Sequence, residues 1–332
     1  MTLSVKNAQA LPAAPLPGDL VVMLFMTRRC NLACSYCHME HEGFAEQTED
    51  QLFRGIDMAF ASYEGALLHF FGGEPLMRMD LVRAGLDYID AHYAHRRHRK
   101  LLTTNGILLR GATLELLLAR DVNLMLSLDG SLDSQGDYRV ALGNNRSAYR
   151  AVIQNLKTLI DRDIPFFVNM CVSPGNVDRM FENVSFLKSL GIARMQIAYE
   201  LGAMWNMEDQ ARYIEQFERC ISTLQGPGFR LQNHGGAEPV LGSSLATLDA
   251  DGQIYTGASV VLEQSNPTFN AASYVGHIDE VKDFRGFVSP RIDVVRYFMK
   301  NTTDRADHAR IRSCMHLGYR VKHAMAKLGH DC

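Results

Sequence analysis

The sequence predicts an α/β fold: a (β/α)6 partial TIM barrel with a small C-terminal hairpin-plus-helices extension. Strand-like and helix-like segments alternate from residue 20 to about residue 225, which indicates a parallel sheet with right-handed crossovers and helices on its outer face. A glycine- and proline-rich break at 225–228 ends this alternation. Polar motifs follow most of the strands, and in barrels of this kind the chemistry gathers where the strands end.

The first three repeats begin with an apolar strand at 20–26, which runs directly into a cysteine-rich loop. Apolar residues recur at helical spacing over 48–62, and Thr48 is a suitable N-cap for that helix. Two strand–helix pairs follow: strand 67–71 ends at Gly72-Gly73-Glu74-Pro75 before helix 81–92, and strand 100–103 ends at Thr104-Asn105-Gly106 before helix 114–119.

The last three repeats have the same form, with an apolar strand, a turn sequence and then a helical pattern. In chain order they are strand 123–128 ending at Asp129-Gly130 with helix 147–161, strand 166–172 ending at Ser173-Pro174-Gly175 with helix 177–190, and strand 194–199 with helix 208–224.

The remainder of the chain predicts a smaller C-terminal region. Segments 244–248 and 253–256 flank Asp249-Ala250-Asp251-Gly252, whose Asp and Gly residues favour a hairpin turn. Helical patterns follow at 290–300 and 304–328. We therefore expect three parts: a flexible N-terminal arm at 1–18, the barrel at 19–225, and the C-terminal region at 226–332.

Composition excludes several classes of function. The chain has 332 residues, 47% of them hydrophobic, which is enough for a large core. Its net charge of −3 gives no overall field that would attract nucleic acid or an anionic membrane, and no apolar run is long enough to span a bilayer. Residues 1–18 lack the pattern of a secretory signal. Seven cysteines, three of them clustered, indicate a reducing, cytoplasmic location.

Cys30, Cys34 and Cys37 stand in one short loop with the spacing C-x3-C-x2-C. Three thiolates this close together can bind one soft metal centre. An iron–sulfur cube has four irons to ligate, so three cysteines would leave one iron open to a substrate or cosubstrate. A structural zinc site is the alternative, and it would need a fourth ligand such as His38 or His41.

This loop resembles the signature of the radical S-adenosylmethionine (radical SAM) superfamily. The resemblance implies one [4Fe–4S] cluster whose open iron chelates SAM. It also implies reductive cleavage of SAM to methionine and a 5′-deoxyadenosyl radical, which abstracts a hydrogen atom from the substrate.

Further motifs resemble the SAM-binding positions of the same family. Gly72, Gly73 and Glu74 resemble its GGE motif, which binds the SAM amino group. Ser127 and Asp129 resemble residues that meet the ribose or carboxylate of SAM, and Arg139 resembles an arginine that pairs with the carboxylate. The family usually has a His-Asp pair before that arginine, whereas Gly136 precedes Asp137 here. A surface arginine is the alternative.

Other candidates lie beside these motifs. Tyr36 resembles the aromatic residue that flanks the adenine, although a packing role is also open. Asn105 and Asn169 are expected in the SAM pocket, because a polar side chain in a barrel mouth needs a partner. Candidates for positioning the substrate or exchanging a proton are the residues at or after the sixth strand: Tyr199, Glu200, His234 and Glu238.

The C-terminal hairpin resembles the first landmark of the SPASM or twitch module, which holds auxiliary clusters in many peptide-modifying members of the family. The cysteine expected after the hairpin is absent, because Thr256, Gly257 and Ala258 stand there. The hypothesis is a SPASM-like scaffold without auxiliary clusters.

The resemblance is greatest to the branch that matures ribosomally made peptides and sulfatases. A precursor peptide is therefore the expected substrate, with a separate leader-binding protein and a reductant such as flavodoxin or ferredoxin as expected partners. Two alternatives stay open: a radical SAM enzyme acting on an amino acid, sugar or cofactor precursor, and a non-catalytic iron–sulfur or zinc protein.

Overall fold

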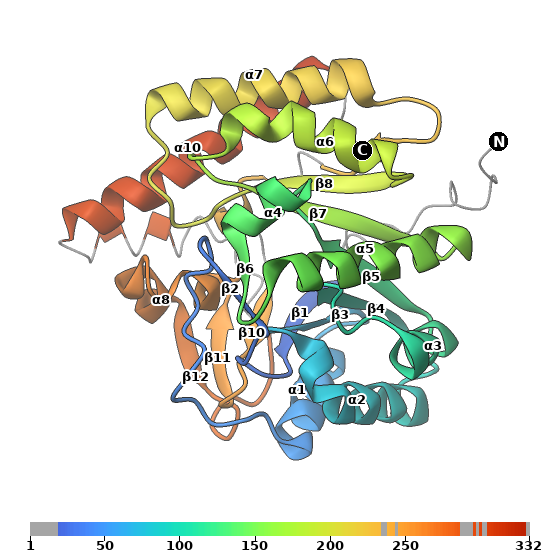
Figure 1. Cartoon of the computed structure of the whole chain (residues 1–332). Coiled ribbons are helices and arrows are strands. Elements are labelled where there is room, and N and C mark those ends of the chain that lie inside the picture. The colour runs from blue at the N-terminus through green and yellow to red at the C-terminus, as the bar shows by residue number, and fades with distance from the viewer. Residues whose placement is uncertain are drawn as a thin grey trace.

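One ten-stranded sheet organises the chain (Figure 1). The computed structural model describes residues 19–233, 238–242, 245–285, 295–296, 299–300 and 304–329. The predicted N-terminal arm at 1–18 and most of the predicted helix at 290–300 lie outside the described residues.

Six strands of this sheet are parallel and follow one another in chain order, as the sequence predicts. Each pairs in register with the next, from β1 to β8. The sheet is open, with β12 at one edge and β9 at the other, so it is a partial barrel. The six strands are β1 (Leu20–Phe25), β3 (Gly65–Phe71), β4 (Arg97–Thr104), β5 (Val122–Ser127), β7 (Phe166–Val172) and β8 (Arg194–Tyr199).

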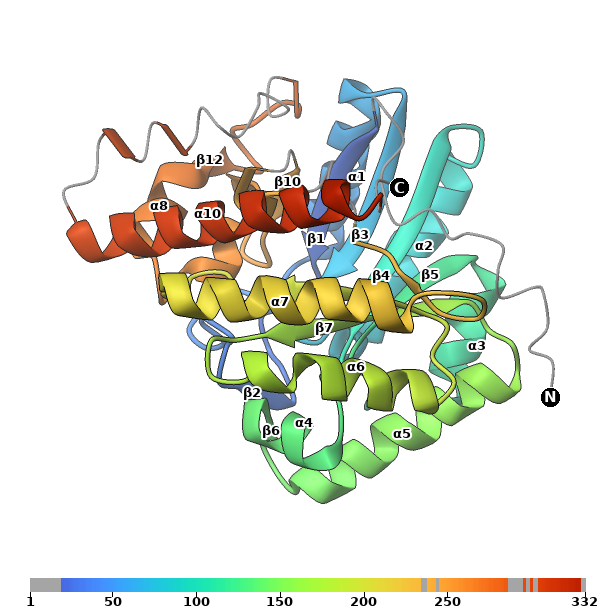
Figure 2. The ribbon, with the colours of Figure 1, turned by 90° about the horizontal axis from the view of Figure 1, so that it is seen from above.

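Helices cover the outer face of these strands (Figure 2). The first begins after Thr48, whose side chain accepts a hydrogen bond from the Gln51 amide while the Gln51 side chain accepts one from the Thr48 amide. This confirms Thr48 as the N-cap. These helices are α1 (Glu49–Ser62), α2 (Met79–His92), α3 (Gly111–Ala119), α5 (Asn145–Asp161), α6 (Met180–Ser189) and α7 (Met207–Leu224). The short helix α4 (Leu132–Tyr138) packs instead against α5 and the strand β6 (Arg139–Ala141).

The expected hairpin is present and extends the barrel sheet. Strand β10 (Ala246–Leu248) pairs parallel with β1, and β11 (Gln253–Thr256) returns antiparallel to it. Strand β12 (Tyr274–His277) completes this edge, and β9 (Arg230–Leu231) extends the other beside β8. The C-terminal hairpin is therefore continuous with the strand that leads into the cysteine loop.

Alternate residues of the strands face two different apolar layers. Residues such as Leu24 and Leu68 belong to the large core between sheet and helices. Leu67, Leu101 and Phe167 form a separate layer inside the barrel. Strands buried on both faces read as continuous apolar runs, so the sequence did not distinguish the inner from the outer side chains.

The C-terminal part ends in α8 (Pro267–Ser273) and a long helix, α10 (Arg305–Lys327), which packs beside α7 (Figure 2). Two three-residue strands, β2 (Leu32–Cys34) and β6 (Arg139–Ala141), pair only with each other. Among the described helices, none combines the length and apolar character needed to cross a bilayer.

Candidate functional site

The three clustered cysteines lie on a loop that a short antiparallel ribbon holds above the barrel. Strand β2 of this loop pairs with β6, which places Cys34 directly opposite Arg139. Cys30, Cys34 and Cys37 are free thiols and are half-buried. The Leu32 amide donates to the Cys30 Sγ at 3.4 Å, and the Cys37 amide donates to the Cys34 carbonyl at 3.0 Å. The loop is thus ordered by its own backbone and by the ribbon.

The electrostatic surroundings of the three thiols differ. Burial raises the pKa of Cys30 to about 12 and that of Cys34 to about 11. Burial alone would also raise the pKa of Cys37, but His41, whose Nε2 lies 3.5 Å from Sγ, holds that pKa below its usual value. A bound metal centre displaces the protons of its thiol ligands. The positive charge of its irons would therefore stabilise the thiolates that burial otherwise disfavours.

Three free cysteine thiols are a donor set that suits an iron–sulfur cube. Within the described ranges, no three His, Cys, Asp or Glu side chains are arranged to hold one metal ion. Cysteines that ligate a cube bind different irons, so their sulfurs need not converge on one point.

Gly72 and Gly73 support the cysteine loop from below. The Gly73 amide donates to the Thr27 carbonyl and the Glu74 amide to the Arg29 carbonyl, both at 2.9 Å. A Cβ on Gly73 would lie 2.3 Å from the Arg29 carbonyl oxygen, so only glycine fits this approach. The two glycines therefore bring the backbone close to the cysteine loop itself.

Glu74 is fully buried and joins two strand ends. Its carboxylate accepts hydrogen bonds from the Leu76 amide at 3.0 Å, the Thr104 hydroxyl at 2.8 Å and the Asn105 amide at 2.8 Å. Burial raises its pKa to about 7, against the lowering effect of these donors. The carboxylate therefore fixes the loops after β3 and β4 relative to each other.

Asn105 links this junction to the cysteine loop. Its Nδ2 donates to the Asn31 Oδ1 at 2.7 Å and lies 4.0 Å from the Cys30 Sγ. The structure thus places this predicted pocket residue within contact distance of one predicted cluster ligand.

Asp129 is the centre of a second buried network. It accepts hydrogen bonds from the Tyr36 hydroxyl, from Arg139 Nε at 2.9 Å and from the Cys171 amide at 3.0 Å. The Arg139 and Asp129 side chains are only 8% and 2% exposed, so Arg139 is not a surface arginine. The Arg139 guanidinium also lies 5.3 Å from the centre of the Tyr36 ring. Three predicted SAM contacts are therefore assembled in one group beside Cys34.

Ser127 and Asn169 lie opposite each other on β5 and β7, and Asn169 lies opposite Gln196 on β8. They share the inner face of the sheet with Phe167, at the ends of the strands. The structure brings both predicted residues to the barrel mouth.

Of the four residues proposed to act on substrate, Glu200 lies beside the cysteine loop. Its Oε1 is 2.9 Å from the His38 Nε2, and its amide donates to the Val172 carbonyl at 2.8 Å. His38 entered the sequence analysis only as a possible zinc ligand. Its position directly after Cys37 was the signal that could have placed it at the site.

Tyr199 and Glu238 contact each other on the other side of the sheet from Glu200. The Tyr199 hydroxyl donates to the Glu238 Oε2 at 2.8 Å, on the outer face of β8 and beneath α10. A Cβ on Gly318 of α10 would lie 2.6 Å from the Tyr199 oxygen. This position does not favour contact with a substrate in the barrel mouth. His234 lies outside the described residues.

Two inner-face residues were missed because they read as ordinary strand positions. Cys171 of β7 is half-buried, and its amide is bonded to Asp129. His69 of β3 lies inside the barrel with its Nε2 2.7 Å from the Thr103 hydroxyl, and burial lowers its pKa to about 3. Neither carried a sequence signal beyond its residue type.

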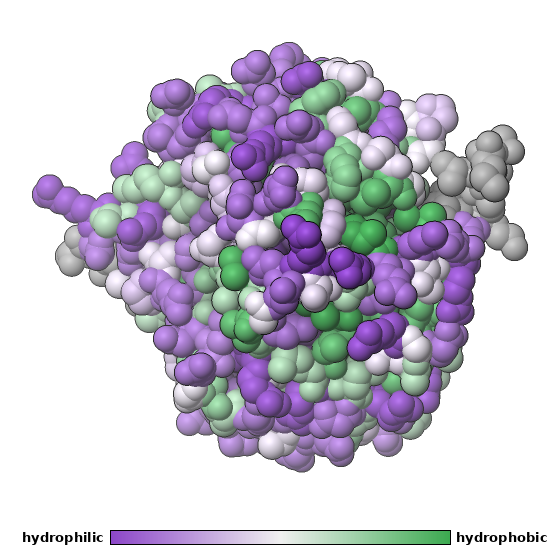
Figure 3. All heavy atoms as spheres, in the orientation of Figure 1, coloured by the Kyte–Doolittle hydropathy of each residue, from purple (hydrophilic) through white to green (hydrophobic). Residues whose placement is uncertain are grey.

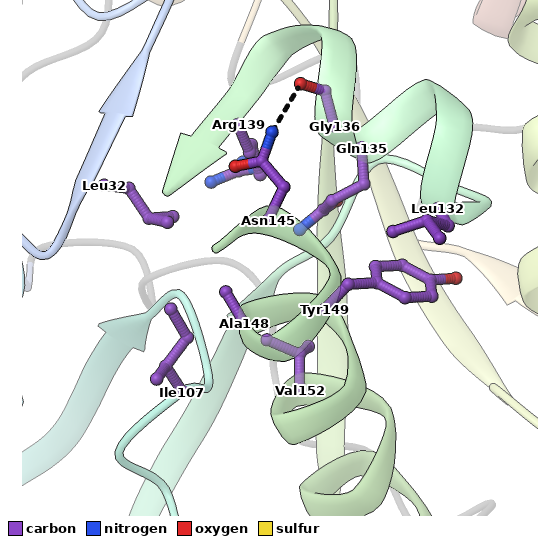
Figure 4. Close-up of a pocket in the computed structure, with 10 residues that line it drawn as sticks. All are labelled: Leu32, Ile107, Leu132, Gln135, Gly136, Arg139, Asn145, Ala148, Tyr149 and Val152. Carbon is purple, nitrogen blue, oxygen red and sulfur yellow. Dashed lines mark hydrogen bonds between the residues drawn. The ribbon is translucent and has the colours of Figure 1, made fainter. Parts of the chain in front are cut away.

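A small cavity lies behind the ribbon (Figure 4). Leu32 and Ile107 lie on one side of it and Leu132 and Tyr149 on the other. Its volume of about 10 Å³ would hold roughly one water molecule. It is too small for a nucleotide. The residues that line it come from the ribbon, α4 and α5, so these three elements meet there.

Comparison with known proteins supports the likeness that the motifs indicate. Residues 24–187 match the sequence profile of the Radical SAM superfamily. The PqqA peptide cyclase of Ruegeria pomeroyi is 29% identical over 208 residues, which cover 61% of this chain and 53% of that protein. The match therefore spans little more than half of that relative.

Two solved structures share the fold. The structure of anSMEcpe with bound AdoMet and the Kp18Cys peptide has a TM-score of 0.66 at 14% identity, with 90% of this chain and 84% of that chain covered. Streptococcus suis SuiB bound to its precursor peptide SuiA has a TM-score of 0.54 at 16% identity, with 84% and 65% covered.

Proposed function

We propose that the chain is a radical SAM enzyme and that its substrate is a ribosomally made precursor peptide; residues 24–187 match the profile of that superfamily. The proposal rests on one observation: the chain is similar, in sequence and in fold, to proteins whose names or structures include peptides. The sequence is similar to PqqA peptide cyclases, and the fold is similar to two enzymes whose structures contain peptides. The fold likeness covers 90% of the chain in one case.

Cys30, Cys34 and Cys37 would hold the family's [4Fe–4S] cluster, because they are free thiols on one ordered loop. One iron would then be left without a protein ligand and open to SAM. When bound, the cluster and SAM together supply the radical that removes a hydrogen atom from the substrate.

The residues around the loop would bind and orient SAM. The buried guanidinium of Arg139 donates from Nε to Asp129. Its other nitrogens can then bind the SAM carboxylate. Ser127 and Asn169 offer a hydroxyl and an amide on the inner face of the barrel mouth. Glu74 and the two glycines before it would set the position of the backbone that meets the SAM amino group.

Glu200 is the proposed contact on the substrate side, with His38 orienting its carboxylate. It lies at the end of the last barrel strand and beside the cysteine loop. A carboxylate here can accept a hydrogen bond from a peptide amide or hold a proton near the reacting carbon. We also propose a cytoplasmic location and a separate partner that presents the leader of the precursor peptide.

The test is an anaerobic assay of the full chain with a reconstituted cluster. With SAM and dithionite it should release 5′-deoxyadenosine, and with a precursor peptide encoded near its gene it should give a peptide of altered mass. The Cys34→Ala variant should do neither. About four irons per chain, rather than about eight, are expected if no auxiliary cluster is present.

Two results would redirect the proposal. Formation of 5′-deoxyadenosine without any change in candidate peptides, but with conversion of an amino acid, sugar or cofactor precursor, would favour a small-molecule substrate. No 5′-deoxyadenosine from fully loaded protein would favour a non-catalytic iron–sulfur protein.

A further inference from the structure

The outer side of the β2–β6 ribbon is apolar and open to solvent. In an antiparallel pair, residues directly opposite each other share a face, and neighbours along the strand alternate. Cys34 and Arg139 share the inner face, so Ala33 and Val140 share the outer one. Val140 is 37% exposed, and Leu142, just after the ribbon, is 70% exposed. A thin two-stranded layer therefore separates solvent from Cys34.

A groove continues this surface over α4 and α5. Its volume is about 420 Å³, and it is lined by Leu132, Arg146, Tyr149, Arg150 and Ile153. The ribbon and the groove are joined through Asn145, whose Oδ1 accepts a hydrogen bond from the Ala141 amide at 2.6 Å. Figure 4 shows Asn145 and Tyr149 on the same helix, where both line the small cavity that Leu32 of the ribbon also lines.

The charge of this surface is opposite to that of the whole chain. Arg146 and Arg150 are exposed, and neither forms an ion pair with any residue that the structure describes. Asp133 on α4 is an exposed acidic residue nearby. Figure 3 shows strongly hydrophilic residues beside hydrophobic ones on the face where α4 and α5 lie. The protein as a whole carries a net charge of −3, so the two arginines form a local positive region.

We propose that the ribbon surface, formed by Val140, Leu142, Arg146 and Arg150, docks a small acidic electron-transfer protein of the flavodoxin or ferredoxin class. This inference rests on the proposed function, because a radical SAM enzyme needs one electron for each cleavage. The reduced carrier loses one electron and the oxidised cluster gains it. Electron transfer slows steeply with distance, and the ribbon is the part of the surface that carries Cys34 on its other side.

The surface has the composition of a transient interface. Exposed apolar residues provide the contact, and the arginines at its rim steer an acidic partner and fix its orientation. Electron-transfer encounters bury less than about 1,200 Å² in total, so a patch of this kind is sufficient.

The test is the rate at which the reconstituted cluster is reduced, followed by its visible absorption. The Arg146→Glu/Arg150→Glu variant is compared with wild type, using reduced flavodoxin, reduced ferredoxin or dithionite. We expect reduction by the protein carriers to slow about tenfold or more, because electrostatic steering changes association rates by at least that factor. Reduction by dithionite should be unchanged, since that small reductant needs no docking surface.

Two further variants make the comparison specific. Arg83→Glu reverses the charge of an exposed arginine on α2, away from the ribbon, and should behave as wild type. Leu142→Glu tests the apolar part of the surface without changing the arginines, and it should also slow the protein carriers alone. Added salt should slow the wild type more than the double variant.

Unchanged carrier-driven rates in both ribbon variants would overturn the proposal. Normal carrier-driven rates with weaker binding of a precursor peptide would also overturn it and assign the surface to the substrate. Slowed carrier-driven reduction without any 5′-deoxyadenosine from the wild type would support the docking surface and contradict the proposed function, so the two failures are distinguishable.

Discussion

Arg28 and Asp249 form a buried ion pair between segments 221 residues apart in the chain. Arg28 Nε lies 3.0 Å from Asp249 Oδ1, and the two side chains are 2% and 0% exposed. Glu263 binds the same guanidinium at 2.6 Å, and the Phe44 ring centre lies 3.5 Å from the guanidinium carbon. Arg28 stands two residues before Cys30, so the pair fixes the C-terminal hairpin directly against the cysteine loop.

Further contacts accompany this ion pair. Within the hairpin, the Thr247 hydroxyl donates to the Gly257 carbonyl at 2.7 Å. Met39 of the cysteine loop packs with Tyr255 and Val260 of the hairpin region in a small separate core. Ion pairs and apolar packing therefore hold the hairpin against the cysteine loop.

Asp249→Asn should destabilise the protein strongly. The substitution leaves the buried Arg28 charge with Glu263 alone, and breaking a buried pair costs about 3–5 kcal/mol. The expected result is a loss of that order in the free energy of unfolding, with a lower iron content after reconstitution. Denaturant unfolding and iron and sulfide analysis measure the two effects.

A matched control is available on the protein surface. Asp279 follows β12 and binds Arg54 of α1 at 2.5 Å, but it is 65% exposed. Exposed ion pairs contribute little, so Asp279→Asn should leave stability and iron content near those of the wild type. Equal losses in the two variants would show that burial of the Arg28 pair is unimportant.

Gly73→Ala should impair the cysteine loop without removing any of the three cysteines proposed to hold the cluster. Its new methyl group would lie 2.3 Å from the Arg29 carbonyl oxygen and 2.5 Å from that of Arg28. Relief requires a backbone shift, and such overpacking costs about 1–3 kcal/mol. We expect a lower melting temperature and less iron per chain. Gly143→Ala, at an open position near the ribbon, should change neither quantity. A Gly73→Ala protein with the iron content of the wild type would show that the loop tolerates the methyl group.

The fold was largely predictable because its six repeats have local signals. The sequence did not show where every strand begins. Strand β4 begins at Arg97, three residues before the predicted strand, because its charged residues are paired: Arg97 with Asp19 and Lys100 with Asp90. Strands β2 and β6 have three residues each and exist only through their mutual pairing, so no periodicity could reveal them.

The candidate residues could be chosen from their places at strand ends, but their contacts with one another could not be predicted. Strand ends identified Glu74 and Asp129, since those ends meet at one edge of a parallel sheet. Their partners come from distant loops, so only the three-dimensional structure shows that both carboxylates bind protein groups. Tyr199 and Glu200 are adjacent in sequence, yet one lies on the outer face of β8 and the other beside His38. A difference of one residue separates the two sides of the sheet.

Glu200→Gln should separate SAM cleavage from modification of the substrate. Glu200 lies beside the cysteine loop but outside the network of Glu74 and the network of Asp129, so 5′-deoxyadenosine formation without peptide should persist. Modified peptide should fall about tenfold or more, the range for losing a group that positions or exchanges a proton. Glu238→Gln, on the outer face, should retain both activities. Mass spectrometry of nucleoside and peptide products gives both readouts, and full peptide modification by Glu200→Gln would remove this residue from the mechanism.

The Glu238→Gln variant also tests the pH dependence of stability. Burial raises the pKa of Glu238 to about 7, above the ordinary value of 4.5. Between these values the native state binds more protons than the unfolded state, so this group makes the protein less stable as pH rises from about 4.5 to about 7. Glutamine accepts the Tyr199 hydrogen bond but does not titrate. Relative to Glu238→Gln, the wild type should lose about 3 kcal/mol over this range, as measured by denaturant unfolding at several pH values.

A carboxylate with the opposite shift provides the control. Glu115 lies on the surface of α3, and its hydrogen bond from Arg162 lowers its pKa. The unfolded state then binds more protons, so the wild type should gain a little stability relative to Glu115→Gln as pH rises through the acidic range. The two differences must therefore have opposite slopes. If the Glu238 difference is flat with pH, that carboxylate keeps its ordinary pKa, and its site beneath α10 is open to water.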